Sequence, residues 1–160
     1  MLDALRLSDL LKPLAATLNG VDTHFDSVSI DARKVARGGL FVALPGSRSN
    51  GHDFVAQARE NGAAAAMVEY LVDDPLQQLL VHDCQLALGQ LGALVRDQFR
   101  GTVIGITGSS GKTTVKEMLA AILRECGPVL ATQGNLNNEL GVPLTLLQLD
   151  AGHRFAVIEM

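Results

Sequence analysis

The sequence is poor in aromatic residues and carries little net charge. Its 160 residues include no tryptophan, one tyrosine and five phenylalanines, and the formal net charge is −4. Stacking platforms for nucleic-acid bases are built from aromatic side chains, and binding to a phosphate backbone requires a basic face. We therefore expect no nucleic-acid partner.

Long apolar runs and frequent cysteines are missing as well. No stretch approaches the roughly 18 to 20 apolar residues that a membrane-spanning helix requires. The first six residues contain no basic segment that leads into an apolar one, so we expect no signal peptide. The only cysteines, Cys84 and Cys126, are too few for a disulfide framework. They favour a reducing, cytoplasmic location, with both thiols as small core residues.

Helix and strand patterns alternate along the chain. We expect a first helix from Ser8 or Pro13 to Asn19-Gly20, followed by a half-buried strand around Val28 and Ile30. Further strands are predicted at 40–44, 63–68, 79–81, 102–106, 129–131 and 155–159, and further helices at 53–61, 83–99, 113–126 and 143–149. Such alternation predicts an α/β fold with mainly parallel sheets. The best domain boundary lies near Arg100-Gly101, which separates residues 1–100 from residues 101–160.

The most specific motif is a glycine-rich segment between a predicted strand and a predicted helix. It reads Thr107, Gly108, Ser109, Ser110, Gly111, Lys112, Thr113, Thr114. Backbone N–H groups at such a helix start converge on an anion. Lys112 would reach the β- and γ-phosphates of a nucleotide, and the Thr113 hydroxyl would ligate Mg²⁺. Because Ile106 stands where the strict pattern has its first glycine, a turn that merely joins strand and helix is the alternative.

A carboxylate follows the last predicted strand. Glu159 ends the run Phe155-Ala-Val-Ile-Glu, at the sheet edge where α/β folds bind ligands. It would hold Mg²⁺ there, or it is a surface acid at a strand end. The four histidines have no paired metal-ligand spacing, so we expect them in surface or capping roles.

Four segments together resemble the Mur ligase family. They are Ser29-Ile-Asp-Ala-Arg33; Gly39 to Gly46 with Gly51-His-Asp-Phe54; Thr107 to Thr114; and Gly134-Asn-Leu-Asn-Asn-Glu-Leu-Gly-Val-Pro143. The phosphate loop alone would also fit a folylpolyglutamate-type ligase. The asparagine-rich fourth segment is what favours the family members that add D-Ala-D-Ala to UDP-MurNAc-tripeptide.

The resemblance implies a three-domain enzyme, of which this chain would supply a part. Residues 1–100 would form a small β/α domain that binds the UDP end of the substrate. Residues 101–160 would form the first part of a central ATP-binding domain with a mainly parallel sheet. The chain stops inside a predicted strand, so we expect it to be truncated. We also expect the protein to be a monomer.

The resemblance also implies roles for individual residues. Lys112 would be catalytic and would hold ATP together with the rest of the loop, while Thr113 and Glu159 would bind Mg²⁺. Substrate-binding roles fall on Asp31, Arg33, Ser47, Asn135, Asn137 and Asn138. The alternative for the three asparagines is a loop-forming, helix-capping cluster. The alternative for Arg33 is a solvated surface arginine. The family motif around Asp31 has a serine where this chain has Ala32, so any contact made by that hydroxyl is lost.

The implied activity is an ATP-dependent amide ligation through an acyl phosphate, in peptidoglycan synthesis. No base and no amine-binding site is evident in this chain, so we expect it to be inactive alone. Two alternatives stay open. One is another Mur-type or folylpolyglutamate-type ligase, and the other is a P-loop nucleotide switch.

Overall fold

The computed structural model describes residues 4–46 and 49–160, and these divide into two compact units between Leu91 and Gly92. The first unit contains β1 (Leu5–Arg6), α1 (Leu7–Leu10), β2 (Thr17–Asn19), β3 (His24–Phe25), β4 (Val28–Ser29), β5 (Leu40–Val42), the 3₁₀ helix η1 (Gly51–Phe54), α2 (Val55–Glu60), β6 (Ala65–Val68) and β7 (Gln77–Leu80). The second contains β8 (Thr102–Ile106), α4 (Lys112–Arg124), β9 (Val129–Ala131), α5 (Gly141–Leu146) and β10 (Phe155–Glu159). The unit boundary falls inside α3 (Cys84–Gln98); the domain boundary after Arg100 stays a prediction.

A five-stranded sheet with the order β2-β7-β6-β5-β4 organises the first unit. Its last four strands are parallel, and β2 is antiparallel to β7. All four residues of β6 are buried, because a central parallel strand is covered on both faces. On one face Phe41 and Ala66 join Val55 and Ala58 of α2 in a hydrophobic cluster.

The N-terminal segment differs from the predicted long helix. Only Leu7–Leu10 is helical, and the chain then turns and forms β2 against β7. Pro13 lies in the turn without a backbone donor, and Ala15 has a φ of 47°, which is incompatible with a right-handed helix. The prediction of one helix from residue 8 or 13 to residue 19 is therefore wrong.

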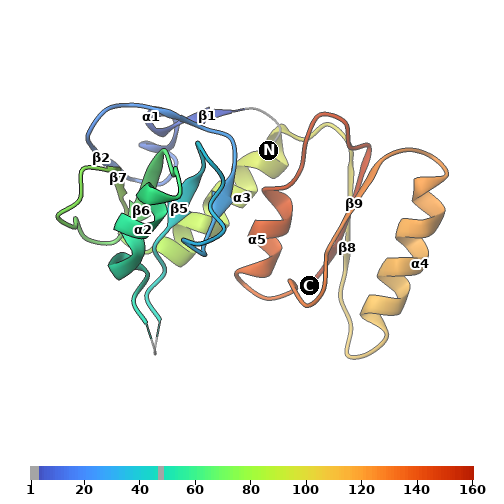
Figure 1. The fold of residues 1–160 in the computed structure, drawn as a ribbon. Helices are drawn as coiled ribbons and strands as arrows, with labels where there is room; N and C mark the ends of the chain where they lie inside the picture. The colour runs from blue at the N-terminus through green and yellow to red at the C-terminus, as the bar shows by residue number, and fades with distance from the viewer. Residues whose placement is uncertain (1–3, 47–48) are drawn as a thin grey trace. The chain divides into compact units, whose positions relative to one another are not determined.

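The second unit is built on a parallel sheet with the order β8-β10-β9 (Figure 1). Residues Phe155 to Glu159 pair with Thr102 to Ile106 on one side and, in part, with Val129 to Ala131 on the other. The helices α4 and α5 lie on opposite faces of this sheet (Figure 1). Ala156, Val157 and Ile158 are buried between them. Because the three strands are parallel, their C-terminal ends meet at one edge of the sheet. The α/β class with mainly parallel sheets is confirmed.

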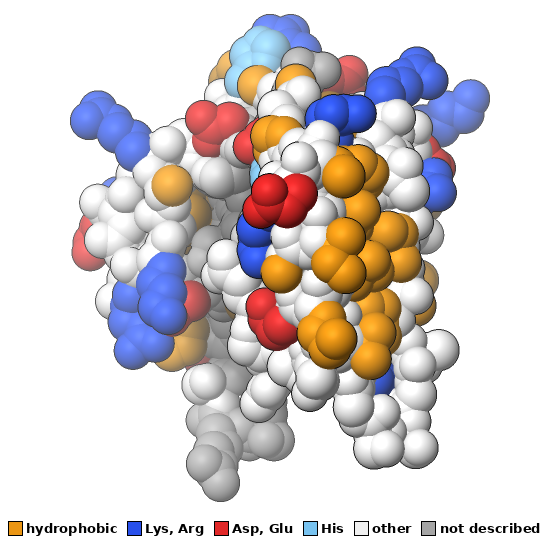
Figure 2. All heavy atoms as spheres, turned by 90° about the vertical axis from the view of Figure 1, so that its right-hand side faces the viewer, with side chains coloured by type: hydrophobic (Ala, Val, Ile, Leu, Met, Phe, Trp, Pro, Cys, Tyr) orange, Lys and Arg blue, Asp and Glu red, His pale blue; other side chains and the backbone are white. Residues whose placement is uncertain are grey.

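An apolar stripe on α4 faces solvent. Val115, Met118 and Ile122 are 53%, 62% and 63% exposed, and they recur at helical spacing. Figure 2 shows hydrophobic side chains gathered over the side of the molecule on which α4 lies. The two cysteines differ from each other: Cys84 is buried, as expected, whereas Cys126 is exposed after the end of α4, so its assignment to the core is wrong.

No helix within residues 4–46 and 49–160 is long and apolar enough to cross a membrane.

Candidate functional site

The glycine-rich segment forms the connection between β8 and α4. Gly111 precedes the first residue of α4 and has a φ of 76°, in the left-handed region that favours glycine. A Cβ atom at this position would meet no atom within 4 Å. The backbone conformation therefore favours glycine here, and a lack of space does not. The loop residues from Thr107 to Gly111 are exposed. The first N–H groups of the 13-residue helix α4 are therefore available to an anion.

Lys112 lies at the first position of α4 and folds back over the loop. Its Nζ atom donates a hydrogen bond to the carbonyl oxygen of Gly108, at 2.9 Å. An ammonium group has three donors, so this bond orients Lys112 toward the loop and leaves donors for a phosphate oxygen. The predicted contact of Lys112 with nucleotide phosphates stays a prediction.

Thr113 and Glu159 come together although they are 46 residues apart in the sequence. The Thr113 hydroxyl lies 3.2 Å and 3.1 Å from the two carboxylate oxygens of Glu159, to which it donates. Asn137 donates from Nδ2 to Oε1 of Glu159, at 3.0 Å. The Glu159 side chain is 3% exposed, so the surface-acid interpretation of this residue is wrong. Sheet topology is the cause, because β10 is the neighbour of β8.

The oxygen atoms at this edge suit a hard cation. A hydroxyl and a carboxylate are ligands that Mg²⁺ accepts, and Mg²⁺ usually takes only one or two carboxylates together with phosphates and water. The described residues contain no group of three or more His, Cys, Asp or Glu side chains placed to hold a metal ion. The donor set therefore fits a cation that arrives with a nucleotide.

Two buried residues beside Glu159 were not predicted from the sequence. Lys116 is 1% exposed and Thr132 is 2% exposed, and the backbone N–H of Glu159 donates to the Thr132 hydroxyl at 2.9 Å. A signal was present, since Lys116 follows Thr113 by three positions and must share its helix face.

The three asparagines of the fourth segment have different surroundings. Asn138 accepts hydrogen bonds at Oδ1 from the N–H groups of Leu140 and Gly141, at 3.3 Å and 2.8 Å, and so caps the start of α5. Asn137 bonds to Glu159, as described above, and Asn135 is exposed. The capping alternative thus applies to the oxygen of Asn138, and substrate-binding roles for all three residues stay predictions.

The first unit has its own pocket, of about 590 Å³. The residues that line it are Ile30, Asp31, Ala32, Arg33, Phe41, Leu44, Ser49, Gly51, Phe54 and Gln57. Two of the predicted substrate-binding residues, Asp31 and Arg33, are among them. Ser47 lies outside the residues that the structure describes. Ala32, which replaces the serine of the family motif, is buried in the hydrophobic cluster.

Asp31 and Arg33 form a bidentate ion pair at this pocket. Nε and Nη2 of Arg33 each lie 2.9 Å from a different carboxylate oxygen of Asp31, and the backbone N–H of Arg33 donates to Oδ1 at 3.0 Å. These bonds hold the pKa of Asp31 at about 2 and raise the pKa of Arg33. The pocket wall therefore contains a guanidinium that a carboxylate holds in place.

A buried histidine braces the segment that leads into the same pocket. The backbone N–H of Glu69 donates to Nε2 of His52 at 2.8 Å, so the ring proton is on Nδ1, 2.7 Å from Oδ1 of Asn50. The imidazole stacks on Tyr70, with ring centroids 4.0 Å apart. Burial lowers the pKa of His52. The expectation that every histidine would be at the surface or at a cap therefore fails here.

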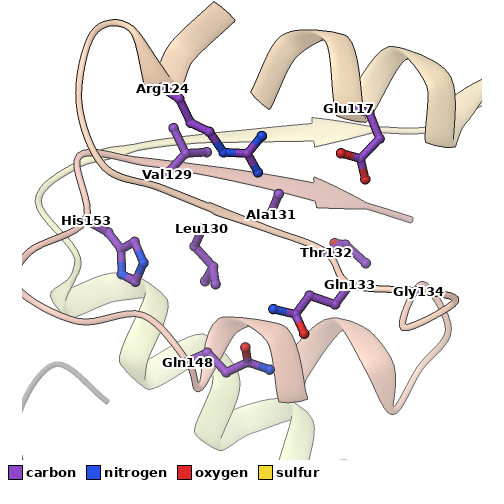
Figure 3. A pocket seen from close by; sticks show the side chains of 10 residues that line it. All are labelled: Glu117, Arg124, Val129, Leu130, Ala131, Thr132, Gln133, Gly134, Gln148 and His153. Atoms are coloured by element: carbon purple, nitrogen blue, oxygen red, sulfur yellow. The ribbon is translucent and has the colours of Figure 1, made fainter. Parts of the chain in front are cut away.

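A polar groove of about 550 Å³ runs along the free edge of β9 (Figure 3). Glu117 and Arg124 of α4 lie on one side of it and Gln148 and His153 on the other. Thr132 stands where β9 ends and the chain turns toward Gly134 (Figure 3). Two residues that contact Lys116, Glu117 and Thr132, line this groove.

Comparisons with known proteins match both units. The family model "Mur ligase family, catalytic domain" matches residues 24–96, and the model "Mur ligase middle domain" matches residues 106–160. A UDP-N-acetylmuramoyl-tripeptide–D-alanyl-D-alanine ligase of Escherichia coli (strain K12) is 51% identical over 154 residues, which are 96% of this chain and 34% of that protein. The chain thus spans about a third of the length of such curated relatives.

Solved structures of MurF proteins are similar to this chain over most of its length. MurF from Acinetobacter baumannii has a TM-score of 0.92 and 44% identity, and covers 99% of this chain, which in turn covers 36% of that protein. MurF from Thermotoga maritima, solved in complex with ADP, has a TM-score of 0.76 and 39% identity, with 84% of this chain and 31% of that protein covered.

Proposed function

Because the chain belongs to the Mur ligase family, we propose that it is part of an ATP-dependent ligase that joins D-Ala-D-Ala to UDP-MurNAc-tripeptide in peptidoglycan synthesis. The reaction is proposed for the whole protein, since the chain covers about a third of each relative. Residues 1–100 would be the domain that binds the UDP-linked substrate. Residues 101–160 would be the first part of the ATP-binding domain.

The observation that carries this proposal is the contact between Thr113 and Glu159, at 3.1 and 3.2 Å. It joins the start of the phosphate-loop helix to the end of a neighbouring strand, and so places a hydroxyl and a carboxylate beside the loop. Thr113 and Glu159 would hold Mg²⁺, which would neutralise charge on the phosphates of ATP.

The residues of the loop would bind the nucleotide. The N–H groups at the start of α4 and the Lys112 ammonium, already turned toward Gly108, would hold the phosphates of ATP. Positioning and charge neutralisation are the main demands of phosphoryl transfer. The product of that transfer would be an acyl phosphate on the substrate carboxylate, which the amine of D-Ala-D-Ala would attack with release of phosphate.

The pocket of the first unit would take the UDP end of the substrate. Its wall combines apolar side chains such as Phe41 and Phe54 with the guanidinium of Arg33, which suits a flat base next to a diphosphate. Asp31 would orient Arg33; the substrate-binding role predicted for Ser47 falls outside the residues that the structure describes. Asn135, Asn137 and Asn138 would contact the peptide end of the substrate with their amides.

The location and the assembly are proposed with the function. ATP and nucleotide-linked precursors are made in the cytoplasm, so we propose that the protein works there, as a monomer. Gel filtration with light scattering tests the monomeric state.

Binding of the two ligands tests the proposal directly. The wild-type chain should bind ADP, and Lys112→Ala should weaken that binding by about 10- to 100-fold, because a charge-assisted hydrogen bond is lost. Saturable binding of UDP-MurNAc-tripeptide in calorimetry should also be found, and its absence would favour a nucleotide switch. An assay of the whole ligase with alternative amino-acid acceptors separates this function from that of another Mur-type or folylpolyglutamate-type ligase.

The isolated chain should not ligate. Release of ADP that depends on added D-Ala-D-Ala would contradict this expectation.

A further inference from the structure

A lysine is buried next to the candidate cation site. Of the lysines and arginines that the structure describes, Lys116 alone is buried, and its side chain is 2% exposed. A buried ammonium is costly unless it is paired and hydrogen-bonded. Its partners therefore indicate why it is there.

Three oxygen atoms surround the Lys116 ammonium. Nζ donates to the carbonyl oxygen of Thr132 at 2.7 Å, and it lies 3.0 Å from Oε1 of Glu117 and 3.9 Å from Oε2 of Glu159. Glu117 is 59% exposed, whereas Glu159 is 3% exposed. The interaction with Glu117 is therefore screened by water, and the interaction with Glu159 is not.

Thr132 connects the same lysine to the backbone of β10. Its hydroxyl accepts from the N–H of Glu159 at 2.9 Å, and its own N–H donates to the carbonyl of Val157 at 3.0 Å. Lys116 thus holds the end of β9 from one side while β10 holds it from the other. The segment that carries Asn137, itself a donor to Glu159, departs from this point.

Thr113 and Lys116 approach Glu159 from one helix face, since they are three positions apart on α4. The hydroxyl reaches the carboxylate from the side of the phosphate loop, and the ammonium reaches it from the side of β9. The carboxylate of Glu159 is therefore held between a hydroxyl and an ammonium of the same helix.

We propose that Lys116 is a positioning residue, which holds Glu159 aimed at Thr113 so that a divalent cation binds with the nucleotide. This inference rests on the proposed nucleotide and cation site. It assigns to Lys116 no contact with the nucleotide itself, because its ammonium is bonded to Thr132 and not to the loop.

The test compares two affinities of the same chain. Binding of a fluorescent ADP analogue in EDTA reports the loop alone, and electron paramagnetic resonance of Mn²⁺ in the presence of ADP reports the cation site. Lys116→Met removes the charge and the donors, Lys116→Gln keeps a donor without the charge, and Lys116→Arg keeps both. Arg124→Met is the matched control, since it removes an exposed cation from the same helix.

Lys116→Met and Lys116→Gln should lower the Mn²⁺ affinity by about 10- to 100-fold, the usual effect of removing a group that orients a metal ligand. In both variants the affinity for ADP in EDTA should stay within about threefold of the wild-type value. Lys116→Arg should restore most of the Mn²⁺ affinity, and Arg124→Met should change neither quantity. If circular dichroism shows that Lys116→Met is unfolded, the Gln and Arg variants decide.

The ammonium at 3.9 Å from Glu159 also repels a cation, so unchanged or increased Mn²⁺ affinity in the Gln variant would overturn the inference. Equal loss in the Gln and Arg variants would overturn it as well. If the wild-type chain binds no ADP, or Lys112→Ala binds it as well as wild type, the proposed function fails first and this inference fails with it.

Discussion

The hydroxyl of Thr113 bridges both carboxylate oxygens of Glu159, at 3.2 Å and 3.1 Å. One residue begins a helix and the other ends a strand, so a single proton donor links the two elements at the edge of the sheet. The cation dependence of nucleotide binding should therefore fail when either partner is changed.

Thr113→Val removes the hydroxyl with little change of volume, and Glu159→Gln removes the charge. Each should reduce the Mg²⁺ stimulation of ADP binding by at least about 10-fold, because ligands of a magnesium site are few. Fluorescence titrations with and without Mg²⁺ measure this. Thr113→Ser keeps the hydroxyl and serves as the control; the prediction is wrong if all three variants respond to Mg²⁺ as the wild type does.

Gly111 and Gly89 allow the cost of a positive φ to be measured by substituting alanine at each. A Cβ atom would meet nothing within 4 Å at either position, but only Gly111 has a positive φ, of 76°. Gly111→Ala should destabilise the chain by about 1–2 kcal/mol, whereas Gly89→Ala, inside α3, should stabilise it by about 0.5–1 kcal/mol. Urea unfolding gives both values, and shifts of the same sign would contradict the assignment.

The stability of the first unit should depend on pH through His52. Burial lowers the pKa of this imidazole below its usual 6.5, so the unfolded chain binds the proton more tightly than the folded chain does. Stability is then full above about pH 6.5 and is lost as the pH falls through the lower folded value. Urea unfolding between about pH 5 and pH 7.5 should show this loss, and His52→Gln should reduce it. His82→Gln, at an exposed position, should leave the pH dependence unchanged.

The ion pair at the pocket predicts a titration shift. The bonds from Arg33 hold the pKa of Asp31 at about 2, against an ordinary value of 3.8. Arg33→Met should raise the pKa of Asp31 toward that ordinary value, as carboxyl NMR titration would show. Arg96→Met removes another exposed arginine, which pairs with Asp97, and should have no effect on Asp31.

Local chemistry made part of the molecule predictable from the sequence. Gly111, Lys112 and Thr113 are neighbours in the chain, so a strand–turn–helix pattern was enough to place them together. The buried strands of both units were recognised for a similar reason, since short apolar runs have few other solutions in an α/β fold.

Contacts between residues far apart in the sequence were not predictable in the same way. The contact of Glu159 with Thr113 depends on the strand order β8-β10-β9, which no local pattern encodes. Lys116 looks like a surface lysine until Thr132 and Glu159 are placed around it. At the N-terminus, the leucine spacing predicted a helix, but the pairing of Thr17 to Asn19 with β7 prevailed.

The position of β10 between β8 and β9 also has a consequence for biosynthesis. Both flanking strands are translated before their shared neighbour, and neither pairs with the other. During translation they leave the ribosome unpaired, and β8 and β9 can join one sheet only after Phe155 to Glu159 has followed. Until that strand arrives the nascent second unit exposes unpaired strand edges, which favour aggregation, whereas the strands β2 and β4 to β7 of the first unit have by then all been translated.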